Sequence, residues 1–302
     1  MNLLQAIILG IVQGLTAFIP VSSTAHLVFA SRWLQLYRDN PQQAEQTTAT
    51  IAVIQLGTLL AVLIYFAPDI FSIAAAFVRD HWRVITRRRG MRFSGTGGVR
   101  PIWLSDEAWL GWLIILGSIP VGTIGLLLKK QIEGEATKNL WVIATMMIVI
   151  ALMLAFAEFV GKQRKDLKNF GIFDALAQGF CQILALVPGS SRSGSTIMGG
   201  LLAGEKREAA ARFSFLLSIP AVLASGLLEL KEALKILDTN SLTQLLVGTI
   251  VSAIVGYLSI WFLLRYLRTH STAVFIIYRI IVGGIILGLL YAGILNPQVS
   301  IK

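Results

Sequence analysis

Cysteine and charge are both scarce in this sequence. Cys181 is the single cysteine among 302 residues, which excludes an internal disulfide and a cluster of thiolate metal ligands. Charged residues make up 14% of the chain, against about 25% in a typical soluble domain, and the mean hydropathy is +0.73. This shortage of charge excludes an ordinary soluble domain and indicates an integral membrane protein. The N-terminal apolar run also lacks preceding basic residues, so we do not expect a cleaved signal peptide.

Charge is missing altogether from several long stretches. A helix needs roughly 17–25 apolar residues to cross a bilayer. Asp, Glu, Lys and Arg are absent from residues 49–67, 108–128, 139–157 and 241–264. Strands of an outer-membrane barrel would be about 9–11 residues long and would alternate apolar and polar residues, which these runs do not. The sequence therefore predicts an all-α integral membrane protein with about six transmembrane helices. The predicted spans are 49–67, 108–128, 139–159, 209–228, 241–264 and 273–293.

Basic residues outnumber acidic ones by 26 to 16, which gives a net charge of +10. In a membrane protein such a surplus lies in loops against anionic lipid, chiefly on the cytoplasmic side, so we expect a membrane partner and no nucleic acid. Residues 68–78 are predicted to be an amphipathic extension of the second element, and 79–106 a basic loop with seven arginines. With that loop in the cytoplasm, 16 basic residues fall inside and 8 outside, and both termini lie outside.

Two of the apolar runs are broken by proline and serine. The first covers 3–31 and the second 172–203, and each carries Ala-x-x-x-Gly-x-x-Gln ahead of a proline and a pair of serines. The spacing from glutamine to proline differs by one residue, so an alignment of the two runs needs a small insertion. We interpret the match as an internal repeat within a single membrane domain, 1–302, with halves of about 1–165 and 166–302. Three spans after each broken element would make this an inverted-topology repeat, with two re-entrant broken helical hairpins that meet near the midplane.

The breaks would bring polar side chains into the membrane. Non-helical backbone is tolerated there only where it is buried in protein or lines a wet cavity. An intramembrane arginine is costly, and its planar fork suits phosphate oxygens, while small residues let backbone N–H groups close on an anion at a helix start. We therefore predict a phosphate pocket. Its candidate residues are Ser22, Ser23, Thr24 and His26 from the first break, and Gly189, Ser190, Ser191, Arg192, Ser193 and Gly194 from the second.

His26 is the candidate for proton transfer. Three residues after Ser23, an imidazole could take the hydroxyl proton, protonate a leaving group or attack phosphorus itself. Taken alone, Pro-x-Ser-Ser-Thr is also an ordinary helix start, and a lone buried histidine is more often structural. Arg279, in the last predicted span, leaves three assignments open: a structural hydrogen bond, a ligand contact, or an ion pair with Glu158 or Glu229.

At this point the residues match a family. GLTAFIPVSSTAHL (14–27) together with PGSSRSG (188–194) resembles the undecaprenyl-pyrophosphate phosphatases of bacteria, the BacA/UppP family linked to bacitracin resistance, over nearly the whole chain. The resemblance implies hydrolysis of undecaprenyl pyrophosphate to undecaprenyl phosphate and inorganic phosphate, at the outer face of the bacterial plasma membrane, for recycling of the cell-wall carrier lipid. It implies catalytic roles for Ser23, His26 and Arg192.

The family's (E/Q)xxxE pattern is incomplete in this chain. Gln13 fills the first place, but Ala17 stands where the resemblance implies a catalytic glutamate. The resemblance also implies stimulation by a divalent cation, Mg²⁺ or Ca²⁺, and a metal ligand would be expected at position 17. We interpret Ala17 as a Glu→Ala substitution that preserves binding of lipid pyrophosphate and slows its turnover.

Two other functions compete with hydrolysis. A flippase or transporter of the polyprenyl phosphate carrier lipid is the alternative, because inverted repeats with broken helices are common in transporters. A non-catalytic lipid-binding protein is a third reading, which Ala17 favours. The expected partners are a polyprenyl pyrophosphate lipid, the membrane, and a second copy of the chain in a homodimer.

Overall fold

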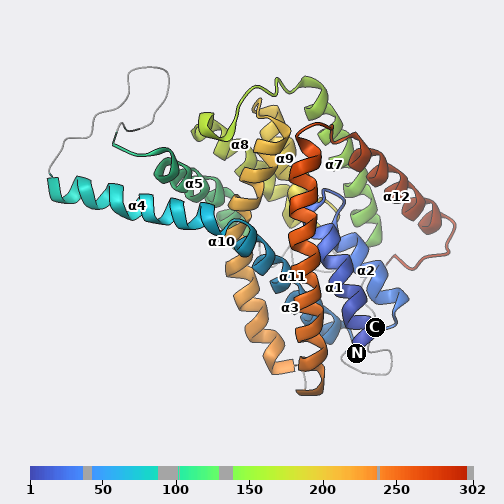
Figure 1. The fold of residues 1–302 in the computed structure, drawn as a ribbon. Coiled ribbons are helices and arrows are strands. Elements are labelled where there is room, and N and C mark those ends of the chain that lie inside the picture. The colour runs from blue at the N-terminus through green and yellow to red at the C-terminus, as the bar shows by residue number, and fades with distance from the viewer. Residues whose placement is uncertain (37–42, 88–100, 102, 129–138, 237–238, 298–302) are drawn as a thin grey trace.

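The structure is a computed structural model that describes residues 1–36, 43–87, 101, 103–128, 139–236 and 239–297. Within these ranges the chain forms an all-helical bundle, as the sequence predicts (Figure 1). The eleven α-helices of these ranges are α1 (Leu3–Phe18), α2 (Ser23–Trp33), α3 (Gln43–Tyr65), α4 (Ala67–Arg87), α5 (Asp106–Leu127), α7 (Leu140–Val160), α8 (Ile172–Ile183), α9 (Arg192–Leu202), α10 (Arg207–Ile236), α11 (Thr239–Leu267) and α12 (Ala273–Tyr291). Two short 3-10 helices are η2 (Leu167–Asn169) and η3 (Leu184–Leu186).

Among the described residues, five helices are long and apolar enough to cross a membrane, so the chain is a multi-pass membrane protein. These candidate spans are Gln46–Tyr65, Asp106–Leu127, Leu140–Val160, Thr243–Leu267 and Ala273–Tyr291. They confirm five of the six predicted spans. The sixth, 209–228, lies within α10 and is helical, but it is not one of the five. Only sixteen residues separate Arg212 from Glu229 in α10, and Pro220 and three serines lie among them.

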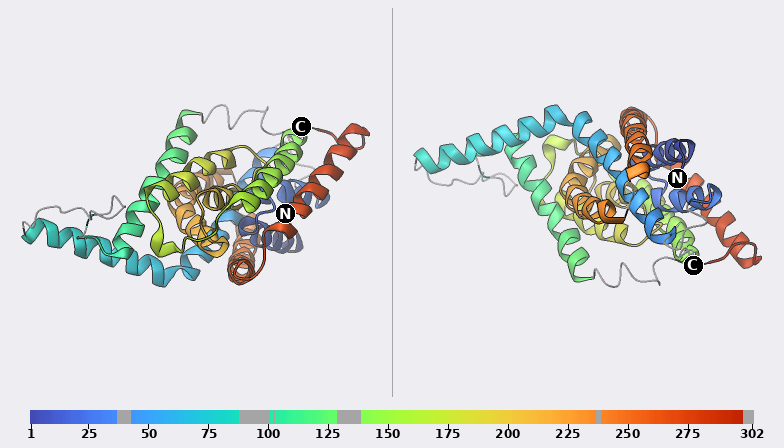
Figure 2. Two further views of the ribbon diagram at one scale, coloured as in Figure 1. Left: turned by 90° about the horizontal axis from the view of Figure 1, so that it is seen from above. Right: turned by 90° about the horizontal axis from the view of Figure 1, so that it is seen from below.

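The basic loop predicted at 79–106 is wrong over its first residues, because α4 continues to Arg87. One face of this continuation packs on α5: Asp80 is buried, and its Oδ2 accepts a hydrogen bond from the Ser105 N–H, which precedes α5, at 2.8 Å. Seen from above and below, α4 extends away from the rest of the bundle (Figure 2). Residues 88–100 lie outside the described residues.

The two broken runs form helical hairpins, as predicted. The first break (residues 19–22) joins α1 to α2, and the second break (residues 187–191) follows α8 and η3 and leads into α9. In Figure 1 the α1–α2 pair occupies the lower half of the bundle and the α8–α9 pair the upper half, so the two hairpins approach each other from opposite ends.

The two hairpins match each other at a constant separation of 169 residues. Ser22 and Ser191 both precede a helix of 11 residues, and their φ angles are 76° and 66°. Thirteen residues later, Gln35 and Gly204 again share a positive φ, of 49° and 88°. This register also pairs Gln13 with Gln182, so the insertion that the sequence alignment needed is wrong. The insertion was needed only because Pro20 was aligned with Pro188. At a separation of 169 residues, these two prolines occupy neighbouring positions of the turn rather than equivalent ones. The internal repeat itself stays a prediction.

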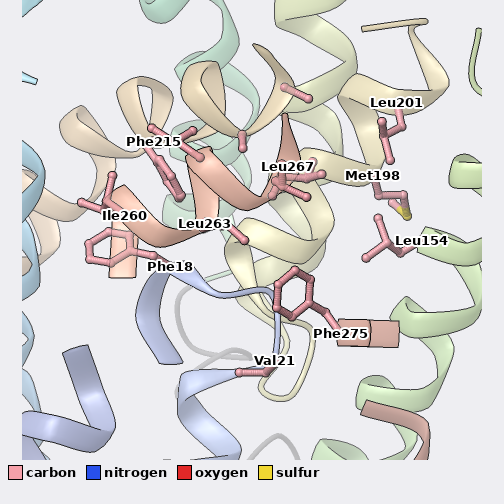
Figure 3. Packing of buried hydrophobic residues seen from close by; sticks show 14 of the residues in the cluster. Phe18, Val21, Leu154, Met198, Leu201, Phe215, Ile260, Leu263, Leu267 and Phe275 are labelled. Atoms are coloured by element: carbon pink, nitrogen blue, oxygen red, sulfur yellow. The ribbon is translucent and has the colours of Figure 1, made fainter. Parts of the chain in front are cut away.

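The largest cluster of buried apolar residues lies around the hairpin tips (Figure 3). Phe18 at the end of α1 and Val21 in the first break belong to it, together with Met198 of α9. The Phe18 ring meets the edge of Phe215 on α10, with ring centroids 5.4 Å apart. Burial of these side chains therefore holds the first break and the second hairpin in one core.

Glu205 is a fully buried carboxyl group between α9 and α10. Its Oε2 accepts a hydrogen bond from Gln178 Nε2 at 2.6 Å, and glycine at position 200 leaves the room for both side chains. Burial raises the pKa of Glu205 to about 8, and nearby Asp174 adds to the rise, against the opposing hydrogen bond from Gln178. The folded protein therefore holds this proton more tightly than the unfolded chain does.

We expect the thermal stability of the protein in detergent to fall as the pH rises from about 4.5 to about 8, and to level off above that. In this window the Glu205 carboxyl is ionised in the unfolded chain and protonated in the folded protein, so unfolding releases a proton. Glu205→Gln should flatten the profile, whereas Glu107→Gln, on an exposed side chain of α5, should leave it unchanged. A Glu205→Gln protein with an unaltered pH profile would contradict this account. The measurement is the apparent Tm across this pH range.

Candidate active site

The first break turns the chain between α1 and α2 through an uncommon backbone conformation. Ser22 lies in the left-handed region, with a φ of 76°, which non-glycine residues rarely adopt. Its side chain is buried, and its Oγ has no hydrogen-bond partner among the described residues. A buried hydroxyl in this state is available to a polar group that enters the site.

The second break repeats this arrangement with tighter packing. Gly189 has a φ of 95°, and a Cβ atom there would overlap the carbonyl oxygen of Ile143 on α7, so the position requires glycine. Ser190 is buried, and within the described part of the chain its Oγ likewise has no partner. Ser191 accepts a hydrogen bond from the Gly194 N–H on its Oγ at 3.2 Å, which caps α9.

Both helices begin earlier than predicted. Ser22 and Ser191 are the N-cap positions, so helix starts with the next residue on each side. The residues that were predicted as loop and are instead helical are Ser23, Thr24 and His26 in α2, and Arg192, Ser193 and Gly194 in α9. The first N–H groups of a helix have no intrahelical acceptor and carry the positive end of its dipole. The N-termini of α2 and α9 therefore carry the positive ends of the two helix dipoles next to the breaks.

Arg279 on α12 joins the two breaks to each other. Its side chain is fully buried, and its NH1 donates to the Pro20 carbonyl of the first break at 3.3 Å. Its NH2 donates to the carbonyls of Gly189 and Ser190 in the second break, at 3.1 and 3.0 Å. Two further bonds from the guanidinium reach the backbone of α7, at the carbonyls of Met146 (3.3 Å) and Met147 (3.0 Å).

These contacts give Arg279 structural hydrogen bonds, one of the assignments that the sequence left open. Glu158, one expected ion-pair partner, instead accepts from Arg207 Nε at 2.6 Å and from Thr272. The side chain of Glu229, the other expected ion-pair partner, lies outside the described residues. Gly194 also matters here, because a Cβ atom at that position would lie 3.1 Å from the Arg279 guanidinium. The buried guanidinium of Arg279 thus donates hydrogen bonds to backbone carbonyls of both breaks, where no helix provides a partner.

His26 is held by a hydrogen bond on each ring nitrogen. Nδ1 lies 2.7 Å from the Ser22 carbonyl oxygen, and Nε2 lies 2.6 Å from the hydroxyl of Tyr278 on α12. A carbonyl oxygen only accepts, so Nδ1 carries the proton, and in a neutral ring Nε2 accepts from Tyr278. The expected partner, Ser23, is not among the hydrogen-bond partners of the imidazole within the described residues.

Gln13 and Ala17 lie one turn apart on α1. Gln13 is buried, and its Nε2 donates to Thr58 Oγ1 at 3.3 Å, while its Oε1 has no partner in the described part of the chain. Ala17 is half-buried and packs against the main apolar cluster. A glutamate at position 17 would stand at the end of α1, next to the first break.

The residues present fit a resident divalent cation poorly. Mg²⁺ and Ca²⁺ favour carboxylate ligands, but the unpartnered buried oxygens near the breaks in the described part of the chain are neutral and belong to Gln13, Ser22, Gln182, Ser190 and Ser195. Ala17 supplies no ligand atom. Within the described ranges, no three His, Cys, Asp or Glu side chains form a group that could hold a metal ion.

Accessibility separates the predicted site residues into two sets. Thr24 is exposed, and Ser23, His26, Ser191 and Arg192 are half-buried, so these side chains are open to a ligand. The buried set contains Gln13, Ser22, Gly189, Ser190, Ser193 and Gly194. The predicted site residues thus include both enclosed and accessible side chains.

A family model described as bacitracin resistance protein BacA matches residues 6–285 of the chain. The chain belongs to the BacA family. It is 49% identical to the undecaprenyl-diphosphatase of Syntrophobacter fumaroxidans over 291 residues, which cover 96% of this chain and 98% of that protein. Similar enzymes of Myxococcus xanthus (45% identical, covering 100% of this chain and 94% of the relative) and Chlorobium chlorochromatii (46% identical, covering 98% and 100%) carry the same name.

Tyr278 was not among the predicted site residues of this BacA-family chain, and Arg279 was predicted without one definite role. Both lie in the run Ile277-Tyr278-Arg279-Ile280 of an otherwise apolar helix. A tyrosine beside an intramembrane arginine is a signal that polar partners lie nearby. The sequence could not name those partners, because they belong to segments more than 85 residues away along the chain.

We expect Arg279→Lys to destabilise the protein by about 3 kcal/mol or more. Lysine cannot donate in a fork to five carbonyls, and each buried acceptor left unpaired costs about 1–3 kcal/mol. The matched control is Arg268→Lys, at an exposed arginine paired with Glu208, where a change of about 0.5 kcal/mol or less is expected. Denaturant titration in detergent micelles gives both free energies. Equal losses in the two variants would refute the role of Arg279.

The histidine contacts predict a tautomer that nitrogen NMR can read. With three histidines in the chain, ¹⁵N-labelled His26 can be assigned by single substitutions of His81 and His270. We expect Nδ1 to carry the proton, and Tyr278→Phe to shift the Nε2 signal while Nδ1 stays protonated by its bond to the Ser22 carbonyl. Phe275→Tyr serves as a control on the same helix. A signal from a protonated Nε2 in the neutral ring would overturn the assignment.

Proposed function

We propose that this chain hydrolyses undecaprenyl diphosphate, the pyrophosphate of the C55 carrier lipid, to undecaprenyl phosphate and inorganic phosphate. The observation that carries the proposal is full-length identity of 45–49% to proteins named undecaprenyl-diphosphatase. The reaction breaks one P–O bond of the anhydride, and water supplies the oxygen to the released phosphate and a proton to balance the products.

The two hairpins support binding of a pyrophosphate. The N-termini of α2 and α9 offer free N–H groups, and Arg192, at the first position of α9, adds a forked cationic donor. Among the described residues neither Arg192 nor Arg279 has a carboxylate partner in hydrogen-bonding range. The positive charge of this region is therefore left for an anionic ligand. The unpartnered Ser22 and Ser190 hydroxyls are further donors.

The chemical step has three candidate nucleophiles: the Ser23 hydroxyl, the His26 imidazole, or a water that either of them directs. In the neutral tautomer described above, the free electron pair of His26 is on Nε2, so that atom acts as base or nucleophile. Because Nε2 faces Tyr278, the Tyr278 hydroxyl must move aside or pass on the proton when His26 reacts. Arg192 stabilises the charge that develops on the phosphoryl oxygens.

Ala17 limits the rate in this proposal. The resemblance to the family places a glutamate there, as a base or as the ligand of a stimulating Mg²⁺ or Ca²⁺, and alanine can do neither. Binding through the hairpin N-termini and Arg192 does not depend on position 17. We therefore propose tight binding of the lipid pyrophosphate together with slow turnover.

The site opens to the outer face of the bacterial plasma membrane in this proposal. The two-to-one bias of basic residues puts the α4 side in the cytoplasm, and the hairpins entering from opposite ends support the inverted-repeat topology with two re-entrant elements. Release of phosphate outside would recycle the carrier lipid for cell-wall synthesis. A homodimer stays a prediction.

A flippase for the polyprenyl phosphate carrier is the second candidate. Broken helices that approach the midplane from both sides favour it, because this arrangement suits alternating access. The two functions differ in what they require of His26. A flippase needs affinity for phosphate but no proton transfer.

The test is release of inorganic phosphate from undecaprenyl diphosphate by the purified chain and by its Ala17→Glu variant. We expect Ala17→Glu to release phosphate about 100-fold faster or more, since a positioned acid or base contributes about 10²–10⁴-fold. In the Ala17→Glu background, Ser23→Ala and His26→Ala should each lower the rate by a similar factor.

The controls are Ser118→Ala, whose hydroxyl bonds only its own helix at Ile114, and His270→Ala, on an exposed histidine. Equal rates for the chain and Ala17→Glu would remove the role assigned to position 17. Undiminished rates in Ser23→Ala and His26→Ala would contradict the catalytic roles proposed for Ser23 and His26. Movement of the lipid across sealed vesicles without phosphate release would favour the flippase.

A further inference from the structure

Helix α4 extends away from the rest of the bundle in both views of Figure 2. It is not among the helices of the described residues that are long and apolar enough to cross a membrane. Its inner face packs on α5: Ala76 is buried, and Trp112 Nε1 donates to His81 Nε2 at 3.1 Å.

The opposite face of α4 is apolar and uncovered. Phe71, Val78, Trp82 and Ile85 are 81%, 68%, 66% and 74% exposed, and their spacing places them on one stripe of the helix. Four large apolar side chains so exposed on one helix need an apolar neighbour. Phe71, Val78 and Trp82 also line an open groove.

Two arginines flank this stripe. Arg79 and Arg83, one turn apart, line the same groove, and both side chains are exposed. Arg79 also bonds Asp80 through Nε at 3.1 Å, and its side chain is 51% exposed. An apolar stripe edged by cations is the pattern of a helix that lies in the headgroup region of an anionic leaflet.

A second copy of the chain fits this surface less well. A two-fold contact between copies would bring the arginine edges toward each other, and like charges at an interface are repulsive. Lipid instead offers acyl chains to the stripe and phosphates to the arginines at the same depth, with Trp82 at the boundary.

We propose that the outer face of α4 binds anionic phospholipid, with the headgroup phosphate on Arg79 and Arg83 and the acyl chains against Phe71, Val78 and Trp82. This site lies on the surface of the bundle, away from the two hairpins, and does not depend on the hydrolase proposal. It gives the protein a lipid preference in addition to its substrate.

The test uses the full chain in vesicles of phosphatidylcholine that contain roughly 20% phosphatidylglycerol, with bromine on the acyl chains of one lipid or the other. Bromine quenches nearby tryptophans, and the difference between the chain and Trp82→Phe isolates Trp82 from the other six. We expect brominated phosphatidylglycerol to quench Trp82 at least about fivefold more, per lipid, than brominated phosphatidylcholine, since each basic residue near a surface contributes a factor of about five.

The double variant Arg79→Gln/Arg83→Gln should lose this preference and retain quenching by either lipid. The matched control, Arg164→Gln/Lys168→Gln, removes two exposed positive charges elsewhere and should keep the preference. Equal quenching by both lipids in the unmodified chain would overturn the headgroup assignment. An unquenched Trp82 would overturn the proposal, and cross-linking between copies through Val78→Cys in Cys181→Ala would then identify a protein interface.

Discussion

The hydrogen bonds from Arg279 to the backbone of both breaks are the interaction on which the site depends. Irregular backbone leaves carbonyl groups without the partners that a helix provides, and buried carbonyls need a hydrogen bond. One guanidinium meets this need for the Pro20 carbonyl on one hairpin and for the Gly189 and Ser190 carbonyls on the other. Its bonds to the α7 backbone fix the arrangement to a candidate membrane span.

This arrangement explains why the site tolerates backbone strain. Ser22 and Ser191 both hold positive φ angles, which cost free energy in a non-glycine residue. The turns let α2 and α9 begin directly after Ser22 and Ser191. The carbonyls of Pro20, Gly189 and Ser190 in the same breaks accept hydrogen bonds from Arg279.

The positive charges of Arg279 and Arg192 near the two breaks also set the electrostatics of this region. Arg279 is fully buried and Arg192 half-buried, and in the described part of the chain neither forms an ion pair with a carboxylate. Adding a glutamate at position 17 would introduce a negative charge at the edge of this region, where Ala17 now packs on the apolar core. Ala17 takes no part in the hydrogen bonds from Arg279 that join the two breaks.

The sequence by itself determined the helical membrane class, five of the spans and the two breaks, because these follow from local composition: uncharged runs, prolines and serine caps. It predicted the helix starts too late, because Ser23 and Arg192 were expected in the breaks and are the first residues of α2 and α9. The tertiary structure decided how the breaks meet, because the partners of Arg279 and the contact between His26 and Tyr278 join segments far apart in the chain. It also decided the register of the two hairpins, since the positive φ angles at Ser22 and Ser191 and at Gln35 and Gly204, rather than matching prolines, recur at one separation. No local pattern encodes such contacts, which arise only when separate helices pack.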